Sequence, residues 1–492
     1  MNPAIIIPTY ISSRRRRSNS NVVAVYDHTT PLTQSGELPR CLDSLLQVQG
    51  IGQIIILVAS EPGIEDEAAA KVQQVADRYP SLSIAVVGAT EAALVQQRFE
   101  QLSLGKLTRE VGLTGYSAVR NLGLVVACAM GFDAVVFLDD DVVVDDEQFL
   151  VKAMYGLGKL TRKGIPILAK TGYYLNSEGS YYSKSQDKWY NHFWQQGKAF
   201  NAWISKAMQS ARLTHSNHVC GGCLAIHKEA FKRLSFDPWI TRGEDLDYLL
   251  NLRMYGSDIW FDNKWYMKHL PPKTDSEGTR FRQDIYRWLY EYRKMEYSRT
   301  QIDLLQVKPA SLEPYPGPFL EPGVERRVRI TALLRSLGRP DKGEYRKAAK
   351  AATGEAKLYA QRNCSKYFEF EFVWPELMAR VENDKILQHA LIECAAQRRM
   401  QSAEARQGRT LQPAGVEGRD AKRSGLRTEV DGNEAMRQAY EMDLNTRQAN
   451  AGLAAQNGMS QARHVQADQQ VMPKAASIDP GKTTQIRLDL DE

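Results

Sequence analysis

The sequence lacks the features that mark several broad classes of protein. Its 64 Lys and Arg residues are nearly balanced by 58 Asp and Glu residues, so no strongly basic surface for nucleic acid is expected. No run of about 18 apolar residues occurs, which argues against a membrane span. Six cysteines in 492 residues are too few for a disulfide framework. The isoleucines near the start are too few for the core of a signal peptide. We therefore expect a reduced, cytoplasmic protein that binds no nucleic acid.

Short apolar runs alternate with helical patterns over about the first 275 residues, which is typical of an α/β sheet domain. Four runs rich in Val and Ile are predicted as strands: Ala4–Ile7, ended by Pro8, then Ile54–Val58, Ile84–Val87 and Val135–Leu138. Helices are predicted between them at Leu38–Val48, Glu65–Arg78 and Ala118–Met130. Because the runs are almost continuously apolar, the strands are expected to be mostly parallel and buried on both faces.

The rest of the chain changes character in steps. A less regular, aromatic stretch is followed at residues 281–299 by the apolar spacing of an amphipathic helix. Residues 309–323 contain five prolines and are predicted to be an extended connector, and helical patterns return from about residue 325. From Gln401 onward large apolar residues are scarce, which predicts disorder. The expected organisation is a sheet domain over 1–275, a helical extension over 276–400 and a tail over 401–492.

Three consecutive aspartates follow the fourth predicted strand. In VVFLDDDVVV, Asp139, Asp140 and Asp141 come directly after a buried apolar run. Carboxylates two residues apart point to the same side of an extended chain, and ligands in parallel sheets bind at the carboxyl ends of strands. Mg2+ and Mn2+ prefer oxygen ligands and often share them with substrate phosphates. The pattern favours a metal–diphosphate site at Asp139 and Asp141 over a plain acidic turn, because three adjacent carboxylates repel one another unless a cation or donors compensate them.

Four motifs in order resemble those of GT-A glycosyltransferases, and among these the large family-2-like group. They are IIIPTY (Ile5–Tyr10), GYSAVRNLGLVVA leading into FLDDD (Gly115–Asp141), GGCLAIHKEAF (Gly221–Phe231) and FDPWITRGEDLDYLLNLRMYG (Phe236–Gly256). The resemblance covers about Pro3–Pro272, slightly over half of the chain. Any one motif alone is a weak signal, whereas the four in this order are a strong one.

The resemblance implies a GT-A fold and a hexosyltransferase that uses a nucleotide-diphosphate sugar donor with Mn2+ or Mg2+. The resemblance does not identify the acceptor, the sugar or the nucleotide base of the donor. The implied donor site comprises Pro8, Thr9, Tyr10, Glu61, Arg120, Asn121, Asp139, Asp140, Gly221 and Gly222. The glycine pair lets backbone approach a ligand closely, because no side chain intervenes. A late histidine completes the metal site in several such enzymes, so His269 is expected to join Asp139 and Asp141.

The acceptor side is predicted at the acidic pair of the fourth motif. In the family this pair opens a helix beneath the acceptor, and its aspartate is the usual candidate base in inverting members. Asp245 is therefore expected to take the acceptor proton, and Glu244 to orient acceptor hydroxyls. The alternative is that the pair has no catalytic role and is acidic only because acidic residues favour helix N-termini. The late histidine is more typical of retaining members, so the stereochemistry stays open.

Two features depart from the family pattern. An aspartate commonly ends the second strand and holds the nucleotide base, but here that place has Ser60 and Glu61. Residues 11–36 form a long insertion that includes Arg14–Arg17. These arginines have the chemistry to clamp a phosphate or an acidic acceptor, although a charge run is more often a solvated loop.

The third motif also contains a CxxC pair. Cys220 and Cys223 are flanked in the sequence by His215, His218 and His227, which makes a zinc site conceivable. The chain has no second CxxC, so the usual spacing of a structural zinc site is absent. Packed thiols are the favoured interpretation.

Two other classes of function remain as alternatives. A sugar-nucleotide pyrophosphorylase would need a glycine-rich N-terminal phosphate loop, and residues 8–20 contain no glycine. A catalytically idle nucleotide-sugar-binding scaffold would suit the tail and the helical extension, which offer a surface for a protein partner. Both acidic sites are retained, however, and this favours the enzyme.

Overall fold

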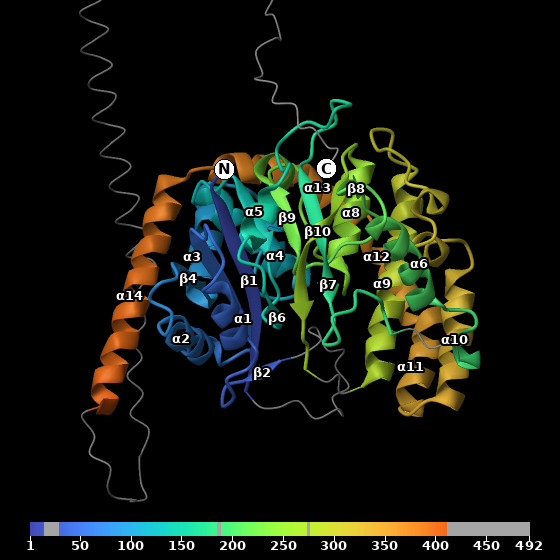
Figure 1. Ribbon diagram of the computed structural model, residues 1–492, viewed down its shortest axis with the longest axis horizontal. Helices are drawn as coiled ribbons and strands as arrows, with labels where there is room; N and C mark the ends of the chain where they lie inside the picture. Colours follow the sequence, from blue (N-terminus) through green and yellow to red (C-terminus); the bar gives the residue numbers. More distant parts are fainter. Residues whose placement is uncertain (14–28, 185–187, 273–275, 411–492) are drawn as a thin grey trace, which may run out of the picture.

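The computed structural model describes residues 1–13, 29–184, 188–272 and 276–410, and its centre is one ten-stranded sheet (Figure 1). The main path has the order β4-β3-β1-β5-β9-β7-β10-β6, with β2 beside β1 and β8 beside β10. The strands are β1 (Pro3–Ser12), β2 (Thr30–Pro31), β3 (Gln53–Ser60), β4 (Ile84–Val87), β5 (Ala134–Phe137), β6 (Val142–Val143), β7 (Ala169–Leu175), β8 (Leu213–His215), β9 (Leu224–His227) and β10 (Ile259–His269).

The first half of the sheet confirms the predicted parallel strands. β1, β3, β4 and β5 pair in parallel, whereas β9 runs antiparallel to both β5 and β7. Alternate residues of β1 belong to different cores: Ile5 and Ile7 pack on one face, and Ala4 and Ile6 on the other. This burial on both faces explains why the strand is apolar without interruption from Pro3 to Pro8.

The prediction that Pro8 ends the first strand was wrong, because β1 continues to Ser12. The carbonyl of Ile6 accepts a hydrogen bond from the Leu138 N–H, so Ile6 faces β5. Backbone groups two residues apart point to the same side, and Pro8 therefore faces β5 as well. The register with β5 ends at Ile6, so Pro8 removes no ladder hydrogen bond, while β3 continues to pair on the other side.

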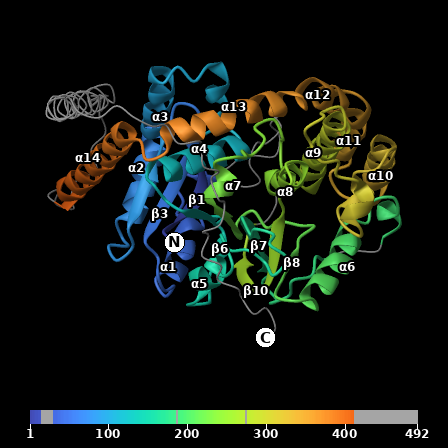
Figure 2. The same ribbon diagram turned by 90° about the horizontal axis from the view of Figure 1, so that it is seen from above.

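Helices cover both faces of the sheet (Figures 1 and 2). Those within the sheet domain are α1 (Leu38–Leu45), α2 (Glu65–Ala76), α3 (Ala89–Gln101), α4 (Tyr116–Ala129), α5 (Phe149–Met154), α6 (Gln196–Met208), α7 (Lys228–Phe231) and α8 (Glu244–Met254). Short 3-10 turns lie at Lys106–Glu110 (η1) and Trp189–Asn191 (η2). α4 contacts β1, β3 and β5 on one side and the helix α13 (Lys366–Val381) on the other, so it is buried nearly all round.

A second group of helices stands beside the β7–β10 part of the sheet (Figure 1). α9 (Glu277–Ser298), α10 (Val324–Gly338), α11 (Lys342–Thr353) and α12 (Glu355–Asn363) pack on one another. The stretch 309–323 is packed rather than extended. It forms two 3-10 turns, η3 (Pro309–Leu312) and η4 (Gly317–Phe319), and it buries Tyr315 and Phe319 against Trp288 of α9.

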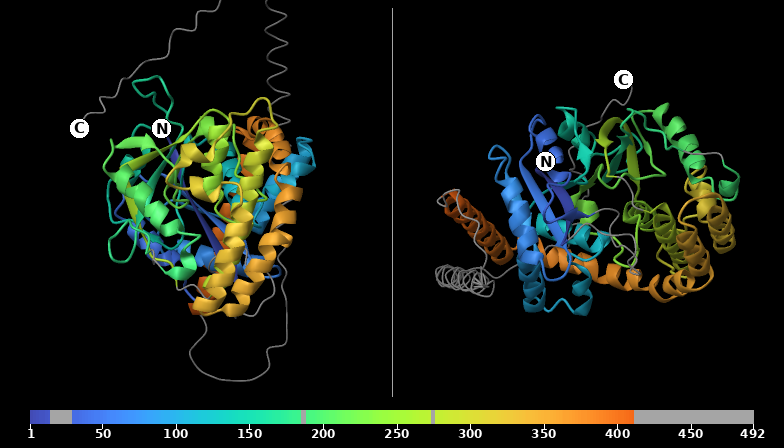
Figure 3. Two further views of the ribbon diagram at one scale, coloured as in Figure 1. Left: turned by 90° about the vertical axis from the view of Figure 1, so that its right-hand side faces the viewer. Right: turned by 90° about the horizontal axis from the view of Figure 1, so that it is seen from below.

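The last two helices return across the molecule to its first strands. α13 runs from α12 past α4, and α14 (Lys385–Thr410) lies against α2, α3 and β4 (Figures 2 and 3). Arg398 of α14 forms a bidentate ion pair with the buried Glu91 of α3, at 2.5 and 2.6 Å. α14 thus continues past Gln401, where the sequence suggested the tail to begin. The remainder of that predicted tail, 411–492, and Arg14–Arg17 lie outside the described residues.

Within these described ranges, no helix combines the length and the apolar character that crossing a bilayer requires.

Candidate active site

A cavity of about 740 Å³ opens where the carboxyl ends of β1, β5 and β7 meet the end of β10. The N-terminus of α8, one face of α9 and Tyr315 of the proline-rich stretch form its other side. The predicted site residues Pro8, Thr9, Tyr10, Arg120, Asp139, Asp140, Asp141, Gly221, Glu244, Asp245 and His269 all line this cavity. Residues separated by more than 200 positions in the sequence therefore share one space.

Asp139, Asp141 and His269 form the metal-ligand group that the sequence predicts. One ligand atom from each lies within 4.8 Å of the others. In the described part of the chain, this is the group of three or more potential metal ligands that lie close together. His269 Nε2 lies 3.2 Å from Asp141 Oδ2. Burial disfavours the charged imidazole, but hydrogen bonding to Asp141 and the charge of both aspartates outweigh it and raise the pKa of His269. Two carboxylate oxygens and an imidazole nitrogen are a donor set that fits a divalent cation.

Local geometry explains how these three ligands converge. The end of β10 pairs with the short strand β6 that follows the aspartates, with His269 opposite Val142. The Leu270 N–H donates a 3.1 Å hydrogen bond to the Asp141 carbonyl, which fixes the two segments side by side. The ring of Tyr174 stacks on His269 at 4.7 Å between centroids. The ligand set therefore comes from two paired strand ends.

Tyr174 connects the metal-ligand group to the glycine pair. Its hydroxyl donates to Asp139 Oδ2 at 2.9 Å and accepts a 2.6 Å hydrogen bond from the Gly222 N–H. A Cβ on Gly222 would lie 2.5 Å from Asp139 Oδ2, so only glycine fits beside this carboxylate. Gly222 does not line the cavity; it allows Asp139 to sit close to the backbone.

Arg120 joins the acidic strand end to the acidic helix start. Its Nε donates to Glu244 Oε1 at 2.9 Å, its Nη1 donates to the Gly221 carbonyl at 3.0 Å, and its Nη2 lies 3.4 Å from Asp139 Oδ1. Burial raises the pKa of Glu244, and the Arg120 charge opposes that rise. One buried guanidinium thus holds a carboxylate from each acidic site at a fixed separation.

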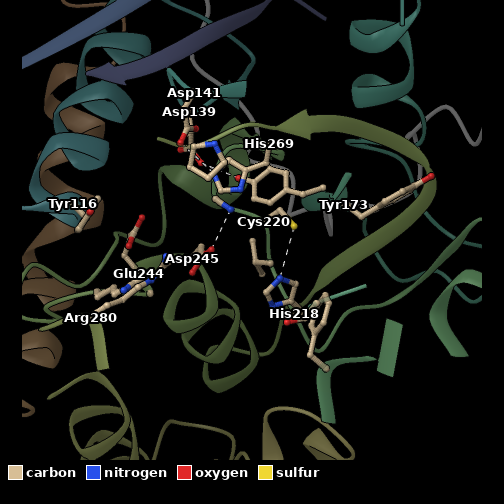
Figure 4. A pocket seen from close by; sticks show the side chains of 18 of the residues that line it. Tyr116, Asp139, Asp141, Tyr173, His218, Cys220, Glu244, Asp245, His269 and Arg280 are labelled. Carbon is tan, nitrogen blue, oxygen red and sulfur yellow. Dashed lines mark hydrogen bonds and ion pairs between the residues drawn. The ribbon is translucent and has the colours of Figure 1, made fainter. Parts of the chain in front are cut away.

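The acidic pair Glu244 and Asp245 begins helix α8, as the sequence suggests. Gly243 caps the helix with a φ of 73°, and a Cβ there would collide with the guanidinium of Arg287. Asp245 Oδ2 accepts from the Gly221 N–H at 3.1 Å, and Oδ1 accepts from the Leu246 N–H at 2.7 Å. Asp245 is half-buried and faces the cavity (Figure 4). Glu244 is buried and is hydrogen-bonded to Arg120.

A buried lysine anchors α8 beneath the cavity. Lys294 of α9 contacts Asp247 of α8 at 2.5 Å and Asp237 of the FDPW segment at 2.7 Å. All three side chains are at most 1% exposed. Burial raises the pKa of Asp247 to about 6, and Lys294 opposes the rise. Breaking such a cluster leaves a buried charge unpaired, so α8 is held firmly in place.

Besides Gly222, two predicted donor residues lie outside the cavity lining. Asn121 is fully buried and exchanges two 2.8 Å hydrogen bonds with the backbone of Phe236, so it joins α4 to the FDPW segment. Glu61 accepts hydrogen bonds from the backbone and hydroxyl of Ser13. Asp140 lines the cavity, and its Oδ2 accepts a 2.5 Å hydrogen bond from the Thr9 hydroxyl.

The CxxC segment is a packed part of the wall. Cys220 and Cys223 are buried free thiols, and burial raises the pKa of both. Cys220 Sγ lies 3.8 Å from His218 Nε2, and burial lowers the pKa of His218 to about 4. In the described ranges these groups do not form a three-ligand cluster, in agreement with the packed-thiol interpretation.

Several cavity residues escaped the sequence analysis. Tyr174 lies in a stretch that looked irregular but is the strand β7. Arg280, Asp284 and Arg287 occupy the cavity-facing side of α9, beside the apolar stripe by which the helix was predicted. Their spacing at intervals of three and four residues is the signal that would have identified a second, polar face.

Comparisons with known proteins give a family for the chain but no near relative. No curated protein sequence matches it. A mannosyltransferase, PcManGT from Pyrobaculum calidifontis, solved with GDP-Man and Mn2+, is 13% identical with a TM-score of 0.37, and the match covers 78% of this chain and 85% of that one. GalNAc-T7, solved with UDP, GalNAc and Mn2+, is 12% identical with a TM-score of 0.33, over 65% of this chain and 54% of that one.

The family model is matched by most of the sheet domain and by the start of the helical wall. The match spans residues 22–291, which is more than half of the chain and includes Asp139, Asp141, Asp245 and His269. The chain belongs to the family described as glycosyltransferase like family 2.

Proposed function

We propose that this protein transfers a hexosyl group from a nucleotide-diphosphate sugar to an acceptor, with a divalent cation at Asp139, Asp141 and His269. The observation that carries the proposal is the single cavity that brings this ligand group together with Arg120 and Asp245 in a chain of the glycosyltransferase family. The proposal assigns residues 1–275 to a GT-A domain. It assigns the following helices, to about residue 400, to the opposite wall of the cavity.

The metal-ligand group is proposed to receive the donor diphosphate. A bound cation would neutralise the negative charge that develops on the leaving diphosphate. Asp141 is the most buried of the three ligands at 2% exposure, and Asp139 and His269 are each 31% exposed on the cavity side. The imidazole nitrogen favours Mn2+ over Mg2+, which prefers oxygen ligands in near-ideal octahedral geometry.

The nucleoside is proposed to lie along the end of β1. Pro8, Thr9 and Tyr10 line the cavity beside the aspartates, and the Thr9–Asp140 hydrogen bond fixes this segment to the acidic strand end. Arg120 stands between the two acidic sites, so its position suits contact with the transferred sugar. Asn121 and Gly222 then support the donor site from behind.

Asp245 is proposed as the general base of an inverting transfer. The acceptor oxygen forms a bond to the sugar C1 as the bond from C1 to the diphosphate breaks, and Asp245 takes the acceptor proton. Hydrogen bonds from the Gly221 and Leu246 N–H groups orient the carboxylate. Glu244 is committed to Arg120, so it acts by placing that guanidinium as well as by orienting acceptor hydroxyls.

A donor-binding screen tests the proposal without a known acceptor. Thermal unfolding is measured with UDP-, GDP-, CDP- and dTDP-sugars in the presence of Mn2+, and then with EDTA. One donor class should raise the midpoint in the presence of metal only, because a ligand that binds the folded state stabilises it. Metal-dependent hydrolysis of that donor separates an enzyme from an idle scaffold. If no donor changes the midpoint, the proposal fails.

A further inference from the structure

A second, smaller cavity adjoins the active-site cavity at its helical side. Its volume is about 420 Å³, and it shares Ser183, Trp194, Gln196, Gly197 and Arg335 with the larger one. Four basic residues line it, Lys184, Lys198, Arg335 and Arg339, against one acidic residue, Glu277. We call it the basic side cavity. The two cavities meet at these shared residues, Arg335 among them.

Arg335 is the central cation of the basic side cavity. It lies on α10 one turn before Arg339, and its guanidinium stacks on the ring of Phe281 of α9 at 4.1 Å. Its Nε donates to the Asn191 side-chain oxygen at 2.9 Å. Within the described ranges no carboxylate lies within ion-pair distance of Arg335. Its guanidinium is thus oriented by stacking and one hydrogen bond, and the charges of Asp284 and Glu277 act on it without forming an ion pair.

The surroundings of Arg335 favour contact between its guanidinium and an anion. Burial lowers the pKa of Arg335 and the charge of Arg339 acts in the same direction, although Tyr345, Asp284 and Glu277 oppose the fall. A partly buried guanidinium without a carboxylate gains much from an anion that reaches it, because both partners are then compensated. The nearest acid of the lining, Glu277, is already paired with Arg339. A planar fork of N–H donors suits a carboxylate or a phosphate group.

The path from the basic side cavity leads to Asp245. Arg287 of α9 packs against Gly243 at the start of α8, and Phe281 lies two turns earlier on the same helix, beneath Arg335. Aromatic rings of Trp194, Phe200 and Tyr315 line the main cavity along this side. Asp245, these rings and Arg335 line the same cavity, so one elongated ligand can contact all of them.

We infer that the acceptor carries an anionic group, a carboxylate or a phosphate, which binds in the basic side cavity at Arg335. The inference rests on the proposed function, because it names the chemical class of that reaction's acceptor. The Arg–anion contact lies away from the metal-ligand group, so it selects the acceptor and leaves donor binding unchanged.

Anion binding is tested by isothermal titration of inorganic phosphate, glucuronate and glucose into the full-length protein with EDTA. Without metal, Asp139 and Asp141 repel anions from the donor site, and the Arg335 variants separate binding in the basic side cavity from binding at the other arginines of the main cavity. At least one anion should bind, and glucose should bind more weakly. Arg335→Gln should weaken anion binding roughly tenfold, whereas Arg335→Lys should lose less, because the charge remains without the fork. Preference for phosphate or for glucuronate identifies the anionic group.

Arg329→Gln is the matched control, because Arg329 lies on the same helix with its side chain exposed to solvent. The inference is overturned if neither anion binds, or if Arg335→Gln and Arg329→Gln bind the anions equally. Donor hydrolysis with Mn2+ is measured separately on the same variants. Hydrolysis without anion binding sinks this inference alone, and anion binding without any donor binding or hydrolysis sinks the proposed function and the acceptor role with it.

Discussion

The two walls of the active-site cavity are built in different ways. One wall, which we call the donor wall after the proposed function, consists of strand ends and carries carboxylates. Ligand atoms of Asp139, Asp141 and His269 there lie within 4.8 Å of one another. The opposite wall consists of helices and carries guanidinium groups, those of Arg280, Arg287 and Arg335 among them. One wall suits a cation and the other suits an anion, so under the proposed function the metal-bound diphosphate and an anionic acceptor would lie against different walls.

The two walls also differ in how their side chains are held in place. Strand ends in a buried sheet hold their side chains rigidly, because the backbone on both sides is paired. The helical wall is joined to the sheet through Lys294 beneath α8 and through packing of the proline-rich stretch. Under the proposed function, donor chemistry therefore resides on the sheet and acceptor choice on the helices.

The strongest test of this division is Asp245→Asn, at the boundary between the walls. Transfer should fall by about 10²- to 10⁴-fold, because the variant cannot accept the acceptor proton. Donor affinity should stay near that of the unmodified protein, since the metal-ligand group is unchanged. Steady-state kinetics and donor titration measure the two effects. A variant that turns over at close to the original rate would assign the base elsewhere and favour a retaining reaction.

Asp141→Ala should break the donor wall alone. Losing the most buried ligand should weaken metal-dependent donor binding by more than about 100-fold, a larger effect than loss of a group outside the coordination sphere. Titration of the donor with Mn2+ and with EDTA measures it. Asp303→Ala, at an exposed carboxylate, is the control. Equal donor affinity for both variants, with or without metal, would contradict the assignment of the metal site.

Arg398→Ala should weaken both walls together by destabilising the fold. Glu91 is 1% exposed, and Arg398 compensates its charge through two short hydrogen bonds. Removing one partner of such a pair costs about 3–5 kcal/mol. Chemical denaturation measures the loss, with the exposed neighbour Arg399→Ala as control. If the two variants unfold at the same denaturant concentration, the contact of α14 with α3 contributes little.

A smaller effect on stability should follow pH through Glu371 of α13. Burial raises the pKa of Glu371 to about 8, although hydrogen bonds from Ser235 oppose the rise. The folded state therefore holds a proton that the unfolded state releases near pH 4.5. This contribution is complete below pH 4.5 and is lost as the pH rises through 8. Glu371→Gln should flatten the fall in unfolding free energy over that window, and an unchanged pH profile would refute the link.

The smallest effect is expected from removal of residues 411–492. Their composition, poor in large apolar residues, predicts no contribution to either wall. A chain that ends after Thr410 retains the contacts of Ser402 and Arg406 with Asp77 of the sheet domain. Donor titration and denaturation should match those of the full-length protein. A chain that ends after Asp384 lacks α14 and should be less stable. The two truncations together locate the start of the dispensable segment.

The donor wall could be predicted from the sequence because its residues are few, consecutive and follow apolar strands. Asp139 and Asp141 were identified from their spacing, and His269 from the resemblance to a family. The helical wall could not be predicted in the same way. Arg335 and Arg287 lie on different helices, and only the packing of α9 against α10 brings them to one cavity. Asn121 was predicted to bind the donor, but the motif alone does not show that its amide faces the backbone of Phe236.

The position of α14 has a consequence for the order of events during synthesis. Arg398 follows Glu91 by 307 residues, so at about 5–20 residues per second it is made roughly 15–60 s later. Throughout this interval the nascent sheet exposes the surface of α2, α3 and β4 that α14 will cover, and Glu91 has no cation from Arg398. The first strands to leave the ribosome are thus among the last to complete their packing.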